Sequence, residues 1–212
     1  MENRWASRVE FVETGRQGDQ AGPPQRGTMQ AQTGDKRAQT SAYTHRKGGP
    51  MSQEQELRSF WRYIAKSVDE VLDCLEQSPQ EWRNWRPGET ANSLYVLATH
   101  VLGSTEFLVL ERLCGENVNR QRAAEFAAEG TEVEPIREAW GDLQARVLEG
   151  FSRLPEGALD QERPFRQEMM TGREILLFAA RHAAEHKGHA ELTLDLITAN
   201  QGQQPPLRQP RT

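Results

Sequence analysis

Between residues 52 and 200, apolar side chains recur at every third or fourth position in four long segments. These segments run from about 52 to 77, 93 to 114, 135 to 154 and 171 to 198. This spacing matches one face of an α-helix, whereas a half-buried strand would alternate polar and apolar residues, and we find no alternation of any length. Amphipathic helices bury their apolar faces against one another. The sequence therefore predicts an all-α fold, a four-helix bundle.

The first two predicted helices carry recognisable ends. The first stops at Ser78-Pro79, because proline disfavours a helical conformation in the residue before it. Asn92 or Ser93 suits the N-cap of the second helix, and Gly115 suits its C-terminal end. The second helix is apolar on most of its faces, which is typical of a central helix.

The remaining segments are bounded in the same way. Pro135 suits the first turn of the third helix, which ends at Pro155-Glu156-Gly157. A loop is expected from there to about Met170. Thr171 with Glu174 fits a capping box that starts the fourth helix. A weaker pattern over 119–129 predicts an additional short helix.

The two ends of the chain differ from this middle part in composition. Residues 1–50 are rich in Gly, Gln, Arg, Thr and Pro, and 201–212 are rich in Gln and Pro. Such segments bury too little apolar surface to offset their ordering entropy, so both are predicted to be disordered. Residues 51–200 are predicted to form one domain. Because a helical pattern opens abruptly at Met51, we expect Met51 or Met29 to be the start and the preceding segment to be a misassigned extension.

Charge and hydropathy exclude several kinds of partner. The net charge is -5, and the first 50 residues hold eight basic and five acidic side chains, so the remainder is acidic. An acidic domain is a poor match for nucleic-acid phosphates. No stretch approaches the roughly 18 apolar residues of a membrane span, and no secretory signal is evident. We expect a cytoplasmic protein without a disulfide, with Cys74 and Cys114 as small apolar residues.

Four of the five histidines fall in two predicted helices. His182, His186 and His189 are spaced by four and three residues, in register with apolar positions from Ile175 to Leu196. This places them on the predicted seam that faces the interior of the bundle. His100 lies in the middle of the second helix. An imidazole buried without a partner is costly, so these side chains require one.

Helix geometry limits which histidines could share a metal ion. His182 and His189 are about 10.5 Å apart along the axis, too far to bind one ion. The pair is therefore either His182 with His186 or His186 with His189, and His100 is the natural third ligand. Glu185 could serve as a fourth ligand, as a hydrogen-bond acceptor or as a base. Three nitrogen ligands leave open positions on the metal, as in catalytic sites.

The chain resembles the DinB/YfiT-like superfamily of bacterial four-helix bundles. The matching features are Trp85-x-Pro87, the histidine in Thr99-His100-Val101, and the segment from His182 to His189, which is similar to the family's H-x-x-x-H-(R/K)-G-Q signature. The resemblance covers roughly 52–200. It implies a divalent cation (Zn, Ni, Mn or Fe) bound by His100, His182 and His186. The chain departs from the family at His189, where glutamine is usual. We expect His189 to lie beside the metal without binding it, with the pair His186/His189 as the alternative.

The resemblance also implies a chemistry. Members include thiol S-transferases and isomerases that use low-molecular-weight thiols, so a metal-dependent thiol transferase or hydrolase acting on a small-molecule thiol or electrophile is expected. Glu185 is the candidate base. Glu106 and Arg181 are candidate polar groups near the site, and Trp82, Trp85 and Trp140 are candidate pocket-lining or core side chains.

Two alternatives to an enzyme stay open. One is a non-catalytic metal-binding or stress-associated bundle, expected to be a homodimer, whose metal site would be closed by a fourth protein ligand such as Glu185 or His189. The other is an interaction module without metal, whose histidines are bonded to one another and to water.

Overall fold

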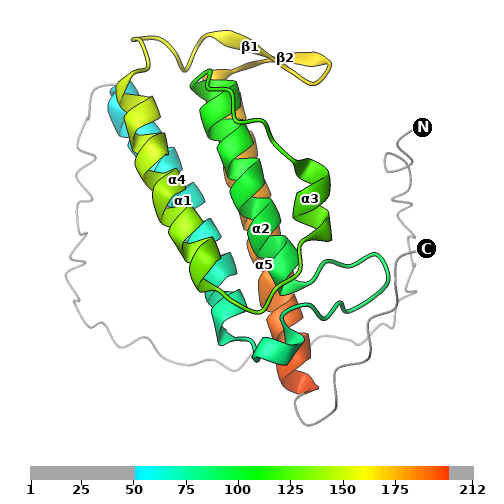
Figure 1. The fold of residues 1–212 in the computed structure, drawn as a ribbon. Coiled ribbons are helices and arrows are strands. Elements are labelled where there is room, and N and C mark those ends of the chain that lie inside the picture. The colour runs from blue at the N-terminus through cyan, green and yellow to red at the C-terminus, as the bar shows by residue number, and fades with distance from the viewer. Residues whose placement is uncertain (1–50, 201–212) are drawn as a thin grey trace, which may run out of the picture. The chain divides into compact units, whose positions relative to one another are not determined.

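The computed structural model describes residues 51–200, which form a mostly helical domain (Figure 1). The prediction of a helical fold is confirmed for most of the described residues, which also include one small two-stranded sheet. The predictions of disorder for 1–50 and 201–212 lie outside the described residues. The predicted start at Met51 or Met29 depends on the same N-terminal residues. In chain order the elements are α1 (Gln53–Gln77), η1 (Gln80–Trp82), α2 (Leu94–Thr105), η2 (Glu106–Leu113), α3 (Arg122–Ala127), α4 (Glu134–Ser152), β1 (Glu162–Phe165), β2 (Glu168–Thr171) and α5 (Gly172–Ala199).

Helix α1 begins and ends where the sequence predicts. The Ser52 hydroxyl accepts the backbone N–H of Gln55, and the Gln55 side chain accepts the N–H of Ser52, which completes a capping box. The helix ends at Gln77, before Ser78 and the following proline. Its buried stripe includes Ile64 and Leu72, both with no exposed surface. α1 therefore contributes a continuous apolar face to the core.

The second predicted helix is not uniform. Ser93 caps α2, as expected, by accepting the backbone N–H of Val96. From Glu106 to Leu113 the chain is a π-helix, η2, with a hydrogen bond from the Cys114 N–H to the Val109 carbonyl at 3.0 Å. Gly115 then takes a φ of 79°, which glycine adopts without strain, and ends the segment. Periodicity could not distinguish π from α winding over eight residues.

The helical stretch Leu94–Leu113 corrects the prediction on membrane-length segments. By length and hydropathy it is apolar enough to cross a membrane. However, 67% of it is buried inside the domain, as expected of a core helix.

A β-hairpin replaces the predicted loop before α5. β1 and β2 pair antiparallel, with Glu162 opposite Thr171 and Phe165 opposite Glu168. Four-residue strands are too short to show alternation, and Pro164 argues against a strand on sequence grounds. The sequence predicted a loop without strands here, and that prediction was wrong. Arg166 lies at the turn with a φ of 58°.

The helices pack into one core. α1 contacts α5, α2 and α4, while α5 also contacts α2 and η2. In Figure 1, α1 lies alongside α4, α2 lies alongside α5, α3 lies beside α2, and the hairpin crosses one end of the long helices. Trp140 is in this core: its ring centroid lies 5.7 Å from that of Trp61 at an interplanar angle of 44°, and its indole N–H donates to Asp69. Trp82 is also buried, so both are core side chains.

Helix α5 starts at a capping box of Thr171 and Glu174, as predicted. Its buried stripe includes Ile175, Ala179, His186 and Thr193, but continues through Ala190 and Ile197. His189 and Leu196 are exposed, so the predicted seam was wrong at its C-terminal end. An α-helix has 3.6 residues per turn, and a repeat of 3.5 therefore drifts by about 20° per heptad away from the buried face.

Candidate metal centre

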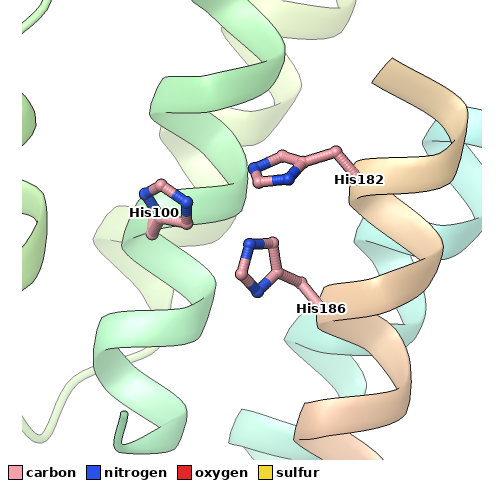
Figure 2. A group of neighbouring side chains, drawn as sticks. All are labelled: His100, His182 and His186. Atoms are coloured by element: carbon pink, nitrogen blue, oxygen red, sulfur yellow. The ribbon is translucent and has the colours of Figure 1, made fainter. Parts of the chain in front are cut away.

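Three of the predicted ligands meet between α2 and α5. His100 comes from the middle of α2, and His182 and His186 come from successive turns of α5 (Figure 2). One ring nitrogen from each lies within 4.8 Å of the others. The ring centroids are 4.4 Å apart for His182 and His186, 4.8 Å for His100 and His186, and 5.3 Å for His100 and His182. This spacing suits three imidazoles around one cation.

The cluster is shielded from solvent. His100 is 4% exposed and His186 is 9% exposed, while His182 is partly exposed. Burial, reinforced by the neighbouring histidines, lowers the pKa of His186 to about 3. Burial, together with His100 and nearby arginines, lowers the pKa of His182 to about 4. Both imidazoles are therefore neutral at pH 7, which is the form that donates a lone pair to a metal.

One atom of the cluster lacks a partner. Nδ1 of His186 is buried and makes no hydrogen bond. Leaving a buried polar atom unsatisfied costs about 1–3 kcal/mol, so this ring is held in the core at a cost to stability. The residues present fit a divalent cation, because three imidazoles lie close together in the core and His182 and His186 are neutral at pH 7.

His100 has a further partner that the sequence did not reveal. Its Nδ1 lies 2.8 Å from Oε2 of Glu125 in α3, and both side chains are buried. Arg120 donates to both oxygens of the same carboxylate, at 2.7 Å each. Burial alone would raise the pKa of Glu125, but the hydrogen bonds from Arg120 and His100 lower it to about 2. Helix α3 is six residues long, so its period could not single out Glu125.

A signal for this contact does exist in the sequence. Gly103 lies one helical turn after His100 inside an apolar helix, where glycine is unfavourable. A Cβ added at Gly103 would lie 2.4 Å from Oε1 of Glu125. An isolated glycine in such a helix indicates a close approach of another group, here a carboxylate.

The other predicted site residues lie at or beyond the edge of the cluster. The ring of His189 is exposed, 5.7 Å from that of His186, and is outside the group of three. Glu185 is exposed, with its carboxylate 3.4 Å from Arg181. Its role as a base stays a prediction. Glu106 pairs with Arg146 of α4 at 2.6 Å and does not join the histidines.

Aromatic and cationic side chains border the exposed edge of His182. The ring of Phe178 stacks on it at 6.1 Å with an interplanar angle of 20°. The guanidinium groups of Arg181 and Arg166 lie over Phe178, at 4.9 and 5.5 Å from its centre. The partly exposed ring of His182 therefore lies beside one aromatic ring that carries two positive charges over it.

A mostly helical domain in which three histidines converge between two core helices is a helical protein with a candidate metal site. The family follows from the sequence: the chain belongs to the DinB superfamily, whose sequence profile matches residues 61–190. That span includes His100, Glu125, His182 and His186. DinB-like proteins bind divalent metals, in keeping with the histidine cluster. No curated protein and no solved structure gives a significant match to this chain.

Proposed function

We propose that the domain is a four-helix bundle of the DinB type in which His100, His182 and His186 hold one divalent cation. We further propose that it is a metal-dependent thiol S-transferase or hydrolase. The observation that carries the metal site is the convergence of three ring nitrogens within 4.8 Å, one of the rings having a buried, unpartnered nitrogen. Zn, Ni, Mn and Fe all accept imidazole ligands, so the donor set does not select among them.

The chemistry assigned to the site follows from its ligand set. A divalent cation held by three neutral nitrogens is a Lewis acid that lowers the pKa of a thiol or water bound to it. The three histidines carry no negative charge to the metal, which keeps it electron-poor. His100 and His186 are buried, whereas His182 is partly exposed beside Phe178. A small molecule would therefore reach the metal from the side of Phe178.

The charges at this edge support an anionic ligand such as a thiolate. Burial is the largest cause of the lowered pKa of His182, and the charge of His100 is the second. The positive charges of Arg120, Arg181 and Arg166 lower this pKa further. The same positive potential would favour an anion over a neutral molecule at the entrance. Arg166 makes cation–π contacts with Phe165 and Phe178, and its guanidinium is available to a carboxylate on a thiol or electrophile.

One observation favours a non-catalytic metal-binding or stress-associated bundle instead. A hollow of about 710 Å³ is lined by Cys114, Arg146, Gly150 and neighbouring residues, and a smaller one of about 250 Å³ by residues of α1 and α5 including Tyr63 and Gly188. Neither hollow is lined by the three histidines. A metal site apart from both of these hollows favours binding of the ion without turnover of a substrate.

Partners and location are proposed on charge and composition. We propose a cytoplasmic protein, in a homodimer, that acts on a small-molecule thiol or electrophile and binds neither nucleic acid nor membrane. The acidic charge of the part after residue 50 supports the absence of nucleic-acid binding.

The test is elemental analysis of the purified full chain beside a His182→Ala/His186→Ala variant. We expect about one divalent ion per chain in the wild type and almost none in the variant, since a single remaining imidazole binds weakly. Circular dichroism should show equal helix content. The loaded wild type is then assayed with small thiols and electrophiles, with the variant as blank. An unchanged metal content in the variant would exclude the site, and equal turnover in both would exclude catalysis there.

A further inference from the structure

Glu125 of α3 and Arg120, two residues before that helix, form an ion pair beside His100. We propose that Glu125, held by Arg120, is a positioning residue that fixes the ring of His100 for metal binding and thereby sets the metal affinity of the site. This inference rests on the metal site proposed above, but not on the thiol chemistry. It concerns a residue outside the three histidines and on a different helix.

Hydrogen-bond chemistry determines which nitrogen of His100 faces the metal. Arg120 donates Nε–H to Oε1 and an Nη2–H to Oε2 of Glu125, both at 2.7 Å. A carboxylate that accepts such a pair is ionised and can only accept. The proton between Glu125 and His100 is therefore on Nδ1 of the ring, at 2.8 Å from Oε2. Nε2 then carries the lone pair, and Figure 2 shows one nitrogen of His100 directed at the other two rings.

Helix α2 has a space that the Glu125 carboxylate occupies. Gly103 leaves the space that Glu125 fills, because a Cβ there would lie 2.4 Å from Oε1 and 2.7 Å from the carboxyl carbon. The Glu125 side chain is 8% exposed and that of Arg120 is 16% exposed. Phe126, the next residue, lies against the other part of His100 with ring centroids 4.5 Å apart. His100 is thus held by both a hydrogen bond and a ring contact from α3.

The segment after α3 is also anchored. The side-chain amide of Asn84 donates to the Gly130 carbonyl at 3.0 Å and accepts the Gly130 N–H at 3.1 Å. Tyr95 of α2 fills the space beside Gly130, where a Cβ would lie 2.3 Å from the ring. The position of Glu125 is therefore set by contacts on both sides of it, and does not depend on the ion pair alone.

The other two rings lack such support. Nδ1 of His186 has no partner, and within residues 51–200 a carboxylate contacts His100 alone among the three. A ligand held in place before the ion arrives strengthens binding, because ordering a free ring opposes it. Carboxylates that orient metal-bound histidines typically change metal affinity by about 10–100-fold when removed.

The experiment measures the metal dissociation constant of the full chain for Zn and Ni by competition with a chelator. Glu125→Ala is expected to weaken binding by about 10–100-fold. Glu125→Gln keeps an acceptor for Nδ1–H but loses the charge, so it should fall between Glu125→Ala and the wild type. Glu106→Gln is the matched control: it removes one carboxylate charge from an ion pair outside the cluster and should leave the dissociation constant unchanged.

A second variant separates positioning from general stability. Gly103→Ala places a methyl group where the carboxylate lies and should weaken metal binding by about tenfold. Alanine is also the better helix former by about 1 kcal/mol, so a role limited to stability predicts no loss of affinity. In metal-free protein, nitrogen NMR of His100 should show the proton on Nδ1 in the wild type and in Glu125→Gln, and a mixture of both forms in Glu125→Ala.

The outcomes distinguish this inference from the function proposed above. Wild-type affinity and an unchanged proton position in both Glu125 variants would overturn it while leaving the three-histidine site intact. The expected loss of affinity without any thiol turnover would uphold it and refute the enzyme. A wild type that binds no metal would overturn both.

Discussion

Helix α5 packs against α1 and against α2, and the two junctions are built from different chemistry. α1 contributes aliphatic side chains such as Val68 and Leu72 with no exposed surface. α2 contributes His100 opposite His182 and His186. The buried aliphatic side chains of this junction need no hydrogen-bond partners, and its polar edges are paired within the chain, as Lys187 of α5 with Glu70 of α1 at 2.9 Å. The histidine junction places polar rings in the core and leaves Nδ1 of His186 without a hydrogen-bond partner among the described residues.

The largest expected effect breaks the aliphatic junction. Leu72→Ala removes a fully buried side chain and should lower the free energy of unfolding by about 2–5 kcal/mol. Because the histidines are on other helices, the folded fraction should still bind metal with wild-type stoichiometry. Urea unfolding followed by circular dichroism, with elemental analysis of the folded protein, measures both. A loss of metal without a loss of stability would contradict the prediction that the α1–α5 junction stabilises the fold and the α2–α5 junction binds the metal.

A smaller effect sharpens the comparison through pH. In metal-free protein the pKa of His182 is lowered to about 4 and that of His186 to about 3, from 6.5. Their neutral forms therefore stabilise the fold fully above pH 6.5, and this contribution is lost as the pH falls towards 4 and 3. At about 1.4 kcal/mol per pKa unit, the loss from His182 alone is about 3 kcal/mol by pH 4.

The measurement for this second prediction is urea unfolding at several values of pH from 7 to 4, beside a His182→Gln/His186→Gln variant that cannot titrate. The variant should show a much flatter dependence. Glu125 titrates at lower pH and is present in both proteins, so it cancels in the comparison. Parallel curves for the two proteins would contradict the prediction.

The smallest effect is expected at His189. Its ring is exposed and outside the cluster, so His189→Gln should keep the metal and change the free energy of unfolding by less than about 0.5 kcal/mol. Elemental analysis and thermal unfolding check this. Loss of metal here would move the site to His186 and His189, the alternative left open by the sequence.

The same contrast explains how much the sequence could predict. Periodicity and capping located α1 and α5 closely, because apolar faces and caps are local properties of the chain. The spacing of His182 and His186 also implied a shared face, and the structure brings His100 to it. Glu125 was missed because it reaches His100 through the docking of a six-residue helix, which no local pattern encodes.

Two other misses have their own physical reasons. The hairpin of Glu162–Phe165 and Glu168–Thr171 depends on pairing between strands too short to alternate. The assignment of His189 to the interior extended a repeat of 3.5 residues along a helix of 3.6, and the error grew with each turn. Counting from Ile175, the face has turned by about 60° at Leu196, three heptads later, which is enough to expose it.

The π-helix η2 has a consequence for comparing this chain with its relatives. A turn of π-helix holds more residues than a turn of α-helix, so a π segment is equivalent to an insertion within a continuous helix. A relative that is α-helical throughout would reach the same point in space with fewer residues. Alignments between His100 and Gly115 should therefore allow a gap inside the helix, where gaps are ordinarily penalised. Without it, every position after Glu106 would be matched to a residue on the wrong face.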